Sequence, residues 1–349
     1  MYHPLEHKLK KINNMKRTKL LITVSLIFIF GYIYGQNQEI EDLVRKGIEF
    51  HDKGEYKKAI ELYQKALIID PNSSLANYEI AFSYFSDKDY KNAEIYSKKV
   101  IDQKDDNLLH AYITYGNALD MQGKTKKAIQ IYEKAMKDFD NYLLYYNYAV
   151  TCLNSGDIDH AYDGAVKAIN NNISHASSHL ILSKIMEKKG SRIKSMLPLY
   201  FFLLLEPDSE RAANEYETLR NYIDHGVTQT SEKKINVVVP MDKDPDFGAA
   251  EMMISLSKAS NTLEENKSKP DLELFAENND KLFKILGQLK KDNSGFWWDL
   301  YVPFFYEIAN KNLTKPFSYY ISLSKGDDTN KWIESNKDEY EKFIKWINN

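Results

Sequence analysis

Small and hydrophobic residues recur along residues 40–209 with a period of about 34 positions. One marker recurs at Ala59, Ala93, Ala128, Ala161 and Ser195. Two further markers keep the same phase, at Gly47, Ala81, Gly116, Ala149 and Ser183, and at Ala66, Val100, Ala135, Ala168 and Phe202. Within each copy, two stretches show helical periodicity and are apolar on one side. The pattern therefore predicts five helix hairpins, whose small anchor residues let the paired helices approach closely.

The turn between the two helices of each copy is marked by glycine. Gly54, Gly123, Gly156 and Gly190 occupy this place, and Lys88 fills it in the second copy. Glycine adopts the left-handed backbone conformation that ends many helices without steric cost. A single hairpin cannot bury its own apolar face, so the copies must stack on one another.

These residues resemble the tetratricopeptide repeat (TPR) family. The segment Gly47–Asn72, GIEFHDKGEYKKAIELYQKALIIDPN, follows the family pattern closely, and Tyr115–Met136 follows it nearly as well. The resemblance covers residues 40–209 and implies an all-α, right-handed superhelix of five TPR helix hairpins. Copies two to four lack the terminal proline that the first copy has at Pro71. Pro198, inside the second helix of the fifth copy, predicts a kink there.

The resemblance also implies a concave face, lined mainly by the first helix of each hairpin, that binds a peptide or a partner's helix. Mapped by phase, the candidate partner-binding residues are Val44, Ile48, His51, Tyr78, Phe82, Phe85, His110, Ile113, Asn117, Tyr146, Val150 and Leu153. The same mapping adds Asp120 and, from the fifth copy, Lys184, Glu187 and Lys188. Aromatic anchors inside a charged rim suit a peptide or helix ligand.

The inner positions also argue against one known ligand class. Family members that bind a C-terminal carboxylate use Lys, Asn and Arg at fixed inner positions, where this chain has Val44, Ile48, Tyr78 and Phe82. We therefore do not expect binding of an acidic tail. Two occupants other than an external ligand stay open, namely the chain's own C-terminal region and a second copy of the chain.

The N-terminal segment is typical of a secretory signal peptide. Basic residues at Met15–Lys19 precede an uncharged run at Leu20–Tyr34, and Gly35 offers a small residue for cleavage. Residues 1–35 are thus expected to be removed, with an uncleaved membrane anchor as the alternative. Without them the formal charge falls from −3 to about −8, which disfavours nucleic acid and anionic lipid as partners. The expected location is the periplasm or cell envelope of a bacterium.

The second half of the chain is helical in pattern, unrepeated and aromatic. A capping helix is predicted at Arg211–Gly226, a polar linker at Thr228–Lys234 and a short strand at Ile235–Val239. Further helices are predicted near Phe247–Asn266, Asp271–Lys291, Gly295–Asn310, Pro316–Ser324 and Thr329–Ile347. The predicted organisation is a TPR array with its capping helix at 36–226, a linker at 227–246 and a C-terminal helical domain at 247–349.

All four tryptophans, Trp297, Trp298, Trp332 and Trp346, lie in this second half. The segment GFWWDLYVPFFYE is either a platform for carbohydrate or peptide, or a packed helical core. Aromatic residues at helical spacing usually pack, so we favour the core. Pro303 within this segment predicts a bend.

Motifs that carry catalysis or bind cofactors are missing from the sequence. It has no Gly-rich phosphate loop, no HExxH, no GxSxG and no paired CxxC. His175 and His179 have a spacing that suits a metal, but His179 falls at a packing position and no third ligand is placed. The acidic run Asp242–Asp246 lacks the Gly and Glu of a calcium loop. We therefore expect no metal and no cofactor, and we expect Cys152 to be a buried thiol.

These observations favour a non-catalytic, exported interaction scaffold that holds a peptide or partner helix on its concave face. One alternative places an envelope-polymer hydrolase or a sugar-binding domain in the second half, with the repeats as a docking module. A hydrolase would need acids such as Asp242, Asp299 and Glu307 to converge in a cleft. Another alternative is assembly through self-association of the repeats.

Overall fold

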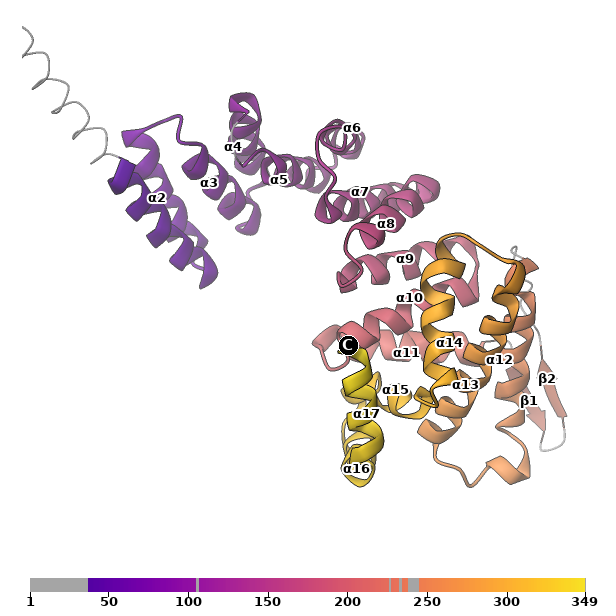
Figure 1. The fold of residues 1–349 in the computed structure, drawn as a ribbon. Coiled ribbons are helices and arrows are strands. Elements are labelled where there is room, and N and C mark those ends of the chain that lie inside the picture. Colours follow the sequence, from indigo (N-terminus) through magenta and orange to yellow (C-terminus); the bar gives the residue numbers. More distant parts are fainter. Residues whose placement is uncertain (1–36, 105–106, 226, 232–233, 238–244, 349) are drawn as a thin grey trace, which may run out of the picture. The chain divides into compact units, whose positions relative to one another are not determined.

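A computed structural model describes residues 37–104, 107–225, 227–231, 234–237 and 245–348 of the chain (Figure 1). The predicted signal segment at 1–35 lies outside the described residues, as do Asp242 and Asp244. The chain forms two compact units, Met1–Phe139 and Asp140–Asn349. This division falls inside the predicted array, while the domain boundaries expected from the sequence stay a prediction.

The first unit contains three helix hairpins. The helix over residues 37–52 pairs with α2 (Tyr56–Ile69), α3 (Ser74–Ser86) pairs with α4 (Tyr90–Gln103), and α5 (Leu108–Met121) pairs with α6 (Thr125–Ala135). Successive helices pack on one another, and α3 also contacts α5. The anchors Ala59, Ala93 and Ala128 are fully buried, as the repeat pattern predicts.

Glycine in the first helix and tyrosine in the second form a matched pair in the first and third hairpins. A Cβ atom at Gly47 would lie 2.3 Å from the ring of Tyr63, and one at Gly116 would lie 2.5 Å from the ring of Tyr132. Both rings are fully buried because the bare backbone makes room for them. In the second hairpin Ala81 takes the glycine position, and the small Ser97 takes the tyrosine position.

The five inter-helix turns share one backbone conformation. Gly54, Gly123, Gly156 and Gly190 have φ values of 75 to 84°, and Lys88 has a φ of 64°. The left-handed conformation predicted from the glycines is confirmed, and the repeat geometry imposes it on Lys88 as well.

The second unit begins with two more hairpins. They are α7 (Tyr142–Ser155) with α8 (Ile158–Asn171), and α9 (Ala176–Lys189) with α10 (Arg192–Leu205). The predicted capping helix follows as α11 (Glu210–Asp224). The described residues thus confirm the all-α class and the five helix hairpins. Cys152 is buried in α7, as predicted.

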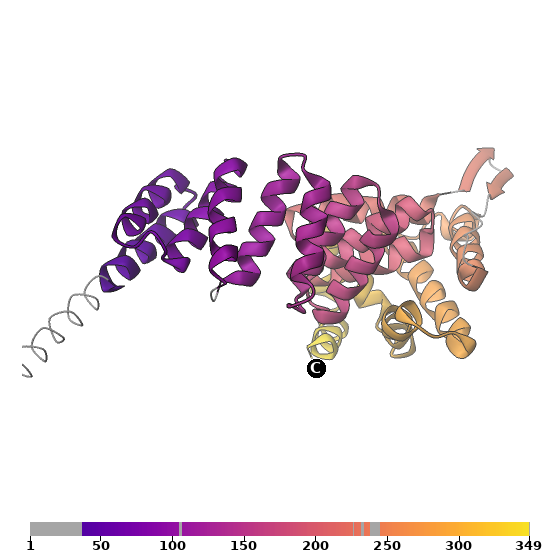
Figure 2. The same ribbon diagram turned by 90° about the horizontal axis from the view of Figure 1, so that it is seen from above.

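A small antiparallel sheet follows α11. Strand β1 (Val227–Ser231) pairs with β2 (Lys234–Val237), and Val227 lies opposite Val237. This hairpin lies at the edge of the second unit beside α12 (Figures 1 and 2). The segment Thr228–Lys234, which we expected to be a linker, therefore includes a strand. Its β-branched residues Thr228 and Thr230 favour that conformation.

The remaining helices complete the second unit. They are α12 (Gly248–Ser260), α13 (Asp271–Leu289), α14 (Val302–Asn310), α15 (Thr314–Tyr320), α16 (Asp327–Ser335) and α17 (Lys337–Ile347). A π-helical turn at Trp297–Tyr301 leads directly into α14, so Pro303 lies in the first turn of α14. The single helix expected at Thr329–Ile347 is two helices, because Asn336 interrupts it and donates to the carbonyl of Trp332.

Helix α10 lies in the core of the second unit. Eleven of its residues from Ile193 to Leu204, all except Lys194, are buried. The hydroxyl of Tyr200 donates to the amide oxygen of Asn279 over 2.5 Å, and its ring contacts Phe283, Phe305 and Phe317. The C-terminal helices therefore cover the fifth hairpin and share its core. Within the described part of the chain, no helix is long and apolar enough to cross a membrane.

Candidate partner-binding face

Four rings from three successive hairpins form a row in the first unit. The ring of His51 stacks on that of Phe82 with centroids 4.7 Å apart, and Phe82 stacks on Tyr78 at 6.4 Å. Tyr78 in turn contacts His110 at 5.9 Å. We call His51, Phe82, Tyr78 and His110 the aromatic row. All four are predicted partner-binding residues, and the structure brings them together across the first helices of their hairpins.

His51 is held at one end of the row. Its Nδ1 atom lies 2.7 Å from the hydroxyl of Ser83, and its ring meets Tyr56 edge-on at 5.1 Å. Burial lowers the pKa of His51, against the opposing effect of Asp52. The ring is therefore neutral at neutral pH and stacks on Phe82 as an uncharged aromatic group.

The face around the row is unusually apolar for an exposed surface. Phe82 is 40% exposed although it is a large aromatic residue. Leu75, one turn before Tyr78 in α3, is 38% exposed, and Met121 at the end of α5 is 56% exposed. Sequence reasoning missed these last two residues, although their spacing of three or four positions from Tyr78 and Asn117 could have shown them. Exposed apolar side chains of this kind favour an interaction site on these helices.

The face also carries acidic side chains. Glu79 follows Tyr78 in α3, and Asp52 follows His51 at the end of the first helix. Burial and the charge of Asp52 raise the pKa of Glu79 to about 7. Burial, with the charge of Glu79, raises the pKa of Tyr78 to about 12. Glu79 is half-buried and is near enough to Tyr78 of the row for its charge to act on that hydroxyl.

Other predicted site residues have structural roles. Val44 is only 1% exposed and belongs to the core of the first hairpin, so it is not available to a partner. The side-chain oxygen of Asn117 accepts a hydrogen bond from the hydroxyl of Tyr132 at 2.5 Å. Phe85 packs on Tyr90 with ring centroids 5.5 Å apart, and Ile48 and Ile113 are half-buried.

The residues predicted from the fourth hairpin lie in the second unit. Tyr146 meets His175 edge-on at 5.0 Å, while Val150 and Leu153 are half-buried. From the fifth hairpin, Lys184 pairs with Glu215 of α11 over 3.3 Å. That these residues and the aromatic row form one continuous face stays a prediction.

The aromatic segment of the second half is a core and not a platform. Trp297 is 6% exposed and Trp298 is 4% exposed. The indole nitrogen of Trp297 donates to the hydroxyl of Tyr162 at 3.1 Å, and Trp298 stacks on Phe247 at 4.6 Å. The preference for a packed core is therefore confirmed for these residues.

The candidate acids for hydrolysis take part in local contacts. Asp299 accepts a hydrogen bond from the backbone N–H of Gly295 at 2.9 Å, and Glu307 pairs with Lys311 at 3.5 Å. Both acids are exposed, unlike a pair shielded in a cleft. Both ring nitrogens of His179 are also engaged, one by Tyr301 and one by the carbonyl of Ile173, so His179 has no free nitrogen for a metal.

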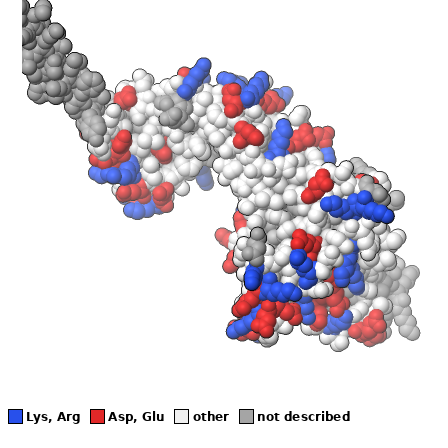
Figure 3. Space-filling view, in the orientation of Figure 1, with Lys and Arg blue, Asp and Glu red and all other residues white. Residues whose placement is uncertain are grey.

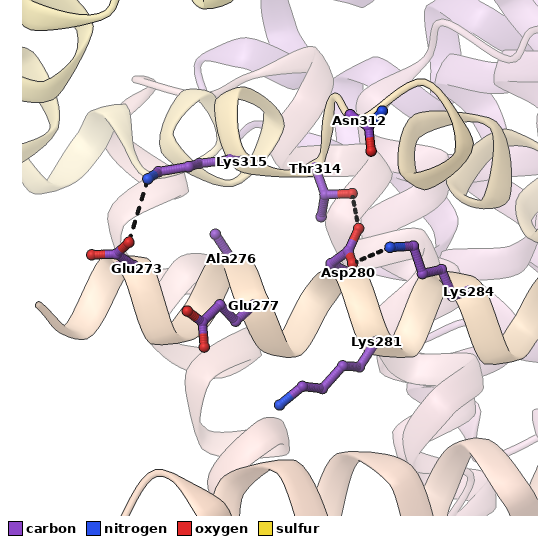
Figure 4. A pocket seen from close by; sticks show the side chains of 9 residues that line it. All are labelled: Glu273, Ala276, Glu277, Asp280, Lys281, Lys284, Asn312, Thr314 and Lys315. Atoms are coloured by element: carbon purple, nitrogen blue, oxygen red, sulfur yellow. Dashed lines mark hydrogen bonds and ion pairs between the residues drawn. The ribbon is translucent and has the colours of Figure 1, made fainter. Parts of the chain in front are cut away.

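Two pockets occur among the C-terminal helices, where Figure 3 shows closely mixed acidic and basic side chains. One has a volume of about 450 Å³ and lies between α13 and the start of α15 (Figure 4). Its carboxylates are already partnered: Asp280 accepts from Lys284 at 2.7 Å and from Thr314 at 3.0 Å, and Glu273 faces Lys315 at 3.4 Å.

The other pocket has a volume of about 720 Å³ and lies between α11, the start of α13 and α16. Arg220 lines it and donates to both carboxylate oxygens of Asp271 at 2.7 Å. Trp332 also lines it and stacks on Tyr319 at 4.1 Å. Among the described residues, no group of three or more His, Cys, Asp or Glu side chains is placed to hold a metal ion.

Comparison with known proteins identifies the repeats. Residues 47–88 match a family model described as TPR repeat, and residues 109–137 match one described as Tetratricopeptide repeat. Together with five hairpins of one geometry, these matches establish the chain as a tetratricopeptide-repeat protein. A search of curated proteins found no match.

Several solved structures are similar in fold. One is a TPR protein of Thermus thermophilus, at 15% identity and a TM-score of 0.45, over 53% of this chain and 98% of that one. PilF of Pseudomonas aeruginosa matches at 18% identity and a TM-score of 0.47, over 54% and 90% of the two chains. The C-terminal part of a TPR repeat-containing protein of Cytophaga hutchinsonii matches at 15% identity and a TM-score of 0.44, over 80% and 94%.

Proposed function

We propose that this chain is an exported, non-catalytic scaffold that binds a peptide or a partner's helix on the face formed by the aromatic row. TPR repeats generally mediate protein–protein binding, and that coarser role follows from the family. The observation that carries the finer proposal is the row itself. The row consists of four rings in successive contact across three hairpins, and Phe82, within the row, is 40% exposed.

The geometry suits a ligand that lies across several hairpins. Each ring of the row comes from the first helix of its hairpin, so one extended or helical segment can contact several repeats at once. Exposed aromatic side chains provide large contact area and lose little conformational entropy on binding. Leu75, three positions before Tyr78, and Met121, four positions after Asn117, are further exposed apolar side chains at helical spacing from predicted site residues.

Site-specific photo-crosslinking in the native host tests the proposal. A photoreactive phenylalanine analogue replaces Phe82, and the matched control carries it at Ile68 of α2, which is apolar and 80% exposed in the same unit. We expect a discrete protein adduct from position 82 that position 68 does not give. The adduct should be lost when Tyr78→Ala is added. Identical adducts from both positions would contradict the assignment of the face.

Export is proposed from the N-terminal pattern alone. Sequencing the N-terminus of the protein purified from its native host tests it, because cleavage after Gly35 leaves Gln36 as the first residue. Recovery of the intact N-terminus in the cytoplasmic fraction would reject export while leaving the binding face untouched.

A further inference from the structure

Charge is divided between the first and second helices of the hairpins in the first unit. Helices α3 and α5 contain no Lys or Arg, and the only carboxyl side chains in them are those of Glu79 and Asp120. The second helices α2, α4 and α6 each contain three lysines. The helix over residues 37–52 contains two bases, Arg45 and Lys46, against five acids, and Arg45, which is 69% exposed, pairs with Asp42 over 2.6 Å. The helices that carry the aromatic row are therefore acidic, and the lysines are concentrated on the other helices.

Glu79 and Asp52 place two interacting carboxyl groups beside the row. Burial opposes ionisation of Glu79, and the charge of Asp52 adds to this effect. Among the described residues, neither acid forms an ion pair with a Lys or Arg. A desolvated carboxylate without a cation is costly, and a cation placed between the two acids would offset that cost.

The neighbouring rings offer a second attraction for a cation. Phe82 and Tyr78 stack with an interplanar angle of only 4°, and Phe82 remains partly exposed. Guanidinium and ammonium groups bind over such ring faces, and their hydrocarbon stems cover apolar surface. Acidic and aromatic groups thus lie side by side on one face, which suits arginine or lysine next to apolar residues.

We infer that the segment bound on this face is basic. Its Lys or Arg side chains pair with Glu79 and Asp52, and its apolar side chains lie against Phe82 and Tyr78. The inference rests on the proposed function, since it specifies the partner chemistry of the same face.

Three pools of synthetic peptides test the inference on the full chain. All pools share one pattern of leucine and phenylalanine, and the variable positions hold only Lys and Arg, only Gln and Ser, or only Asp and Glu. Fluorescence anisotropy measures the affinity of each pool. We expect the basic pool to bind about tenfold more tightly than the neutral pool and to weaken as salt is raised.

The variants identify which acids matter. Glu79→Gln with Asp52→Asn should remove the preference for the basic pool, whereas Glu61→Gln with Glu133→Gln, which removes two acids at exposed sites on α2 and α6, should keep it. Equal binding of the basic and neutral pools that Phe82→Ala abolishes would overturn the inference and keep the proposed function. Tighter binding of the acidic pool would also overturn it, and no binding by any pool would overturn both. In the crosslinking experiment, an adduct of position 82 with this chain itself would show that the occupant is not a partner.

Discussion

The hydroxyl of Tyr301 lies 2.6 Å from Nδ1 of His179 and joins the π-helical turn to α9. The other ring nitrogen, Nε2, lies 2.7 Å from the carbonyl oxygen of Ile173. A carbonyl only accepts, so Nε2 carries the proton and Nδ1 accepts from Tyr301. His179 is therefore a neutral, fully hydrogen-bonded histidine in the core, where it links the fifth hairpin to the C-terminal helices.

The stability of the second unit should fall in mild acid because of His179. Burial lowers the pKa of His179 from 6.5 to about 4. Between these values the unfolded chain binds a proton that the folded chain does not, so stability is lost as pH falls through 6.5 towards 4. We expect a loss of about 2 kcal/mol between pH 7 and pH 5 from this group.

Urea unfolding at pH 7 and pH 5 measures this effect. His179→Gln should lower the stability at pH 7 and flatten its dependence on pH. His225→Gln, at an exposed site, should leave the pH dependence of stability unchanged. A His179→Gln protein with the full wild-type pH dependence would contradict the assignment.

The buried ion pair between Arg192 and Glu251 should hold α10 to α12. The guanidinium Nε lies 2.6 Å from a carboxylate oxygen, and the two side chains are 6% and 2% exposed. The guanidinium also donates to the hydroxyl of Ser255 at 2.9 Å. Arg192→Met removes the cation and leaves the charge of Glu251 in the core, so we expect a loss of about 3–5 kcal/mol.

A double-mutant cycle separates the pair from its surroundings. Arg192→Met with Glu251→Leu should be clearly more stable than the sum of the two single changes predicts, because no buried charge then remains. Strictly additive losses in chemical denaturation would show that the pair is not coupled.

Lys88→Gly should stabilise the first unit. Lys88 has a φ of 64° in a turn where four other hairpins have glycine. A left-handed residue with a Cβ atom costs about 1–2 kcal/mol, and the greater entropy of glycine in the unfolded chain offsets part of this gain. We expect a net gain of about 0.5–1 kcal/mol. Slower hydrogen exchange of the α3 and α4 amides would report it, and Gly123→Ala should have the opposite effect on α5 and α6.

Gly116→Ala should destabilise the third hairpin. The added Cβ would lie 2.5 Å from the ring of Tyr132, which is fully buried and cannot move without displacing its neighbours. Overpacking of this kind costs about 1–3 kcal/mol. The same change at Gly248, where a Cβ meets nothing within 4 Å, provides the control in thermal unfolding. Equal effects of the two substitutions would contradict the role of the glycine–tyrosine pair.

The aromatic row was only partly predictable. The phase of the repeat predicted that Tyr78 and Phe82 lie on one face of the first helix of their hairpin, because residues three to four apart share a helix face. It also placed Val44 on the binding face, but the structure buries that side chain in the core of the first hairpin. Exposure depends on what neighbouring helices cover, and no spacing rule contains that information. Glu79 was missed for the same reason, because its burial and the nearby charge of Asp52 depend on how the hairpins pack.

The sequence by itself determined the five hairpins, their small anchors and the left-handed turns at the four glycines. These features depend on contacts within one repeat or between adjacent repeats, so a fixed spacing encodes them. Only the tertiary structure decided that α10 is enclosed by C-terminal helices through Tyr200, Asn279 and the Arg192–Glu251 pair. Those contacts join residues 59 to 79 positions apart without any repeat, and their partners are set by how whole helices pack.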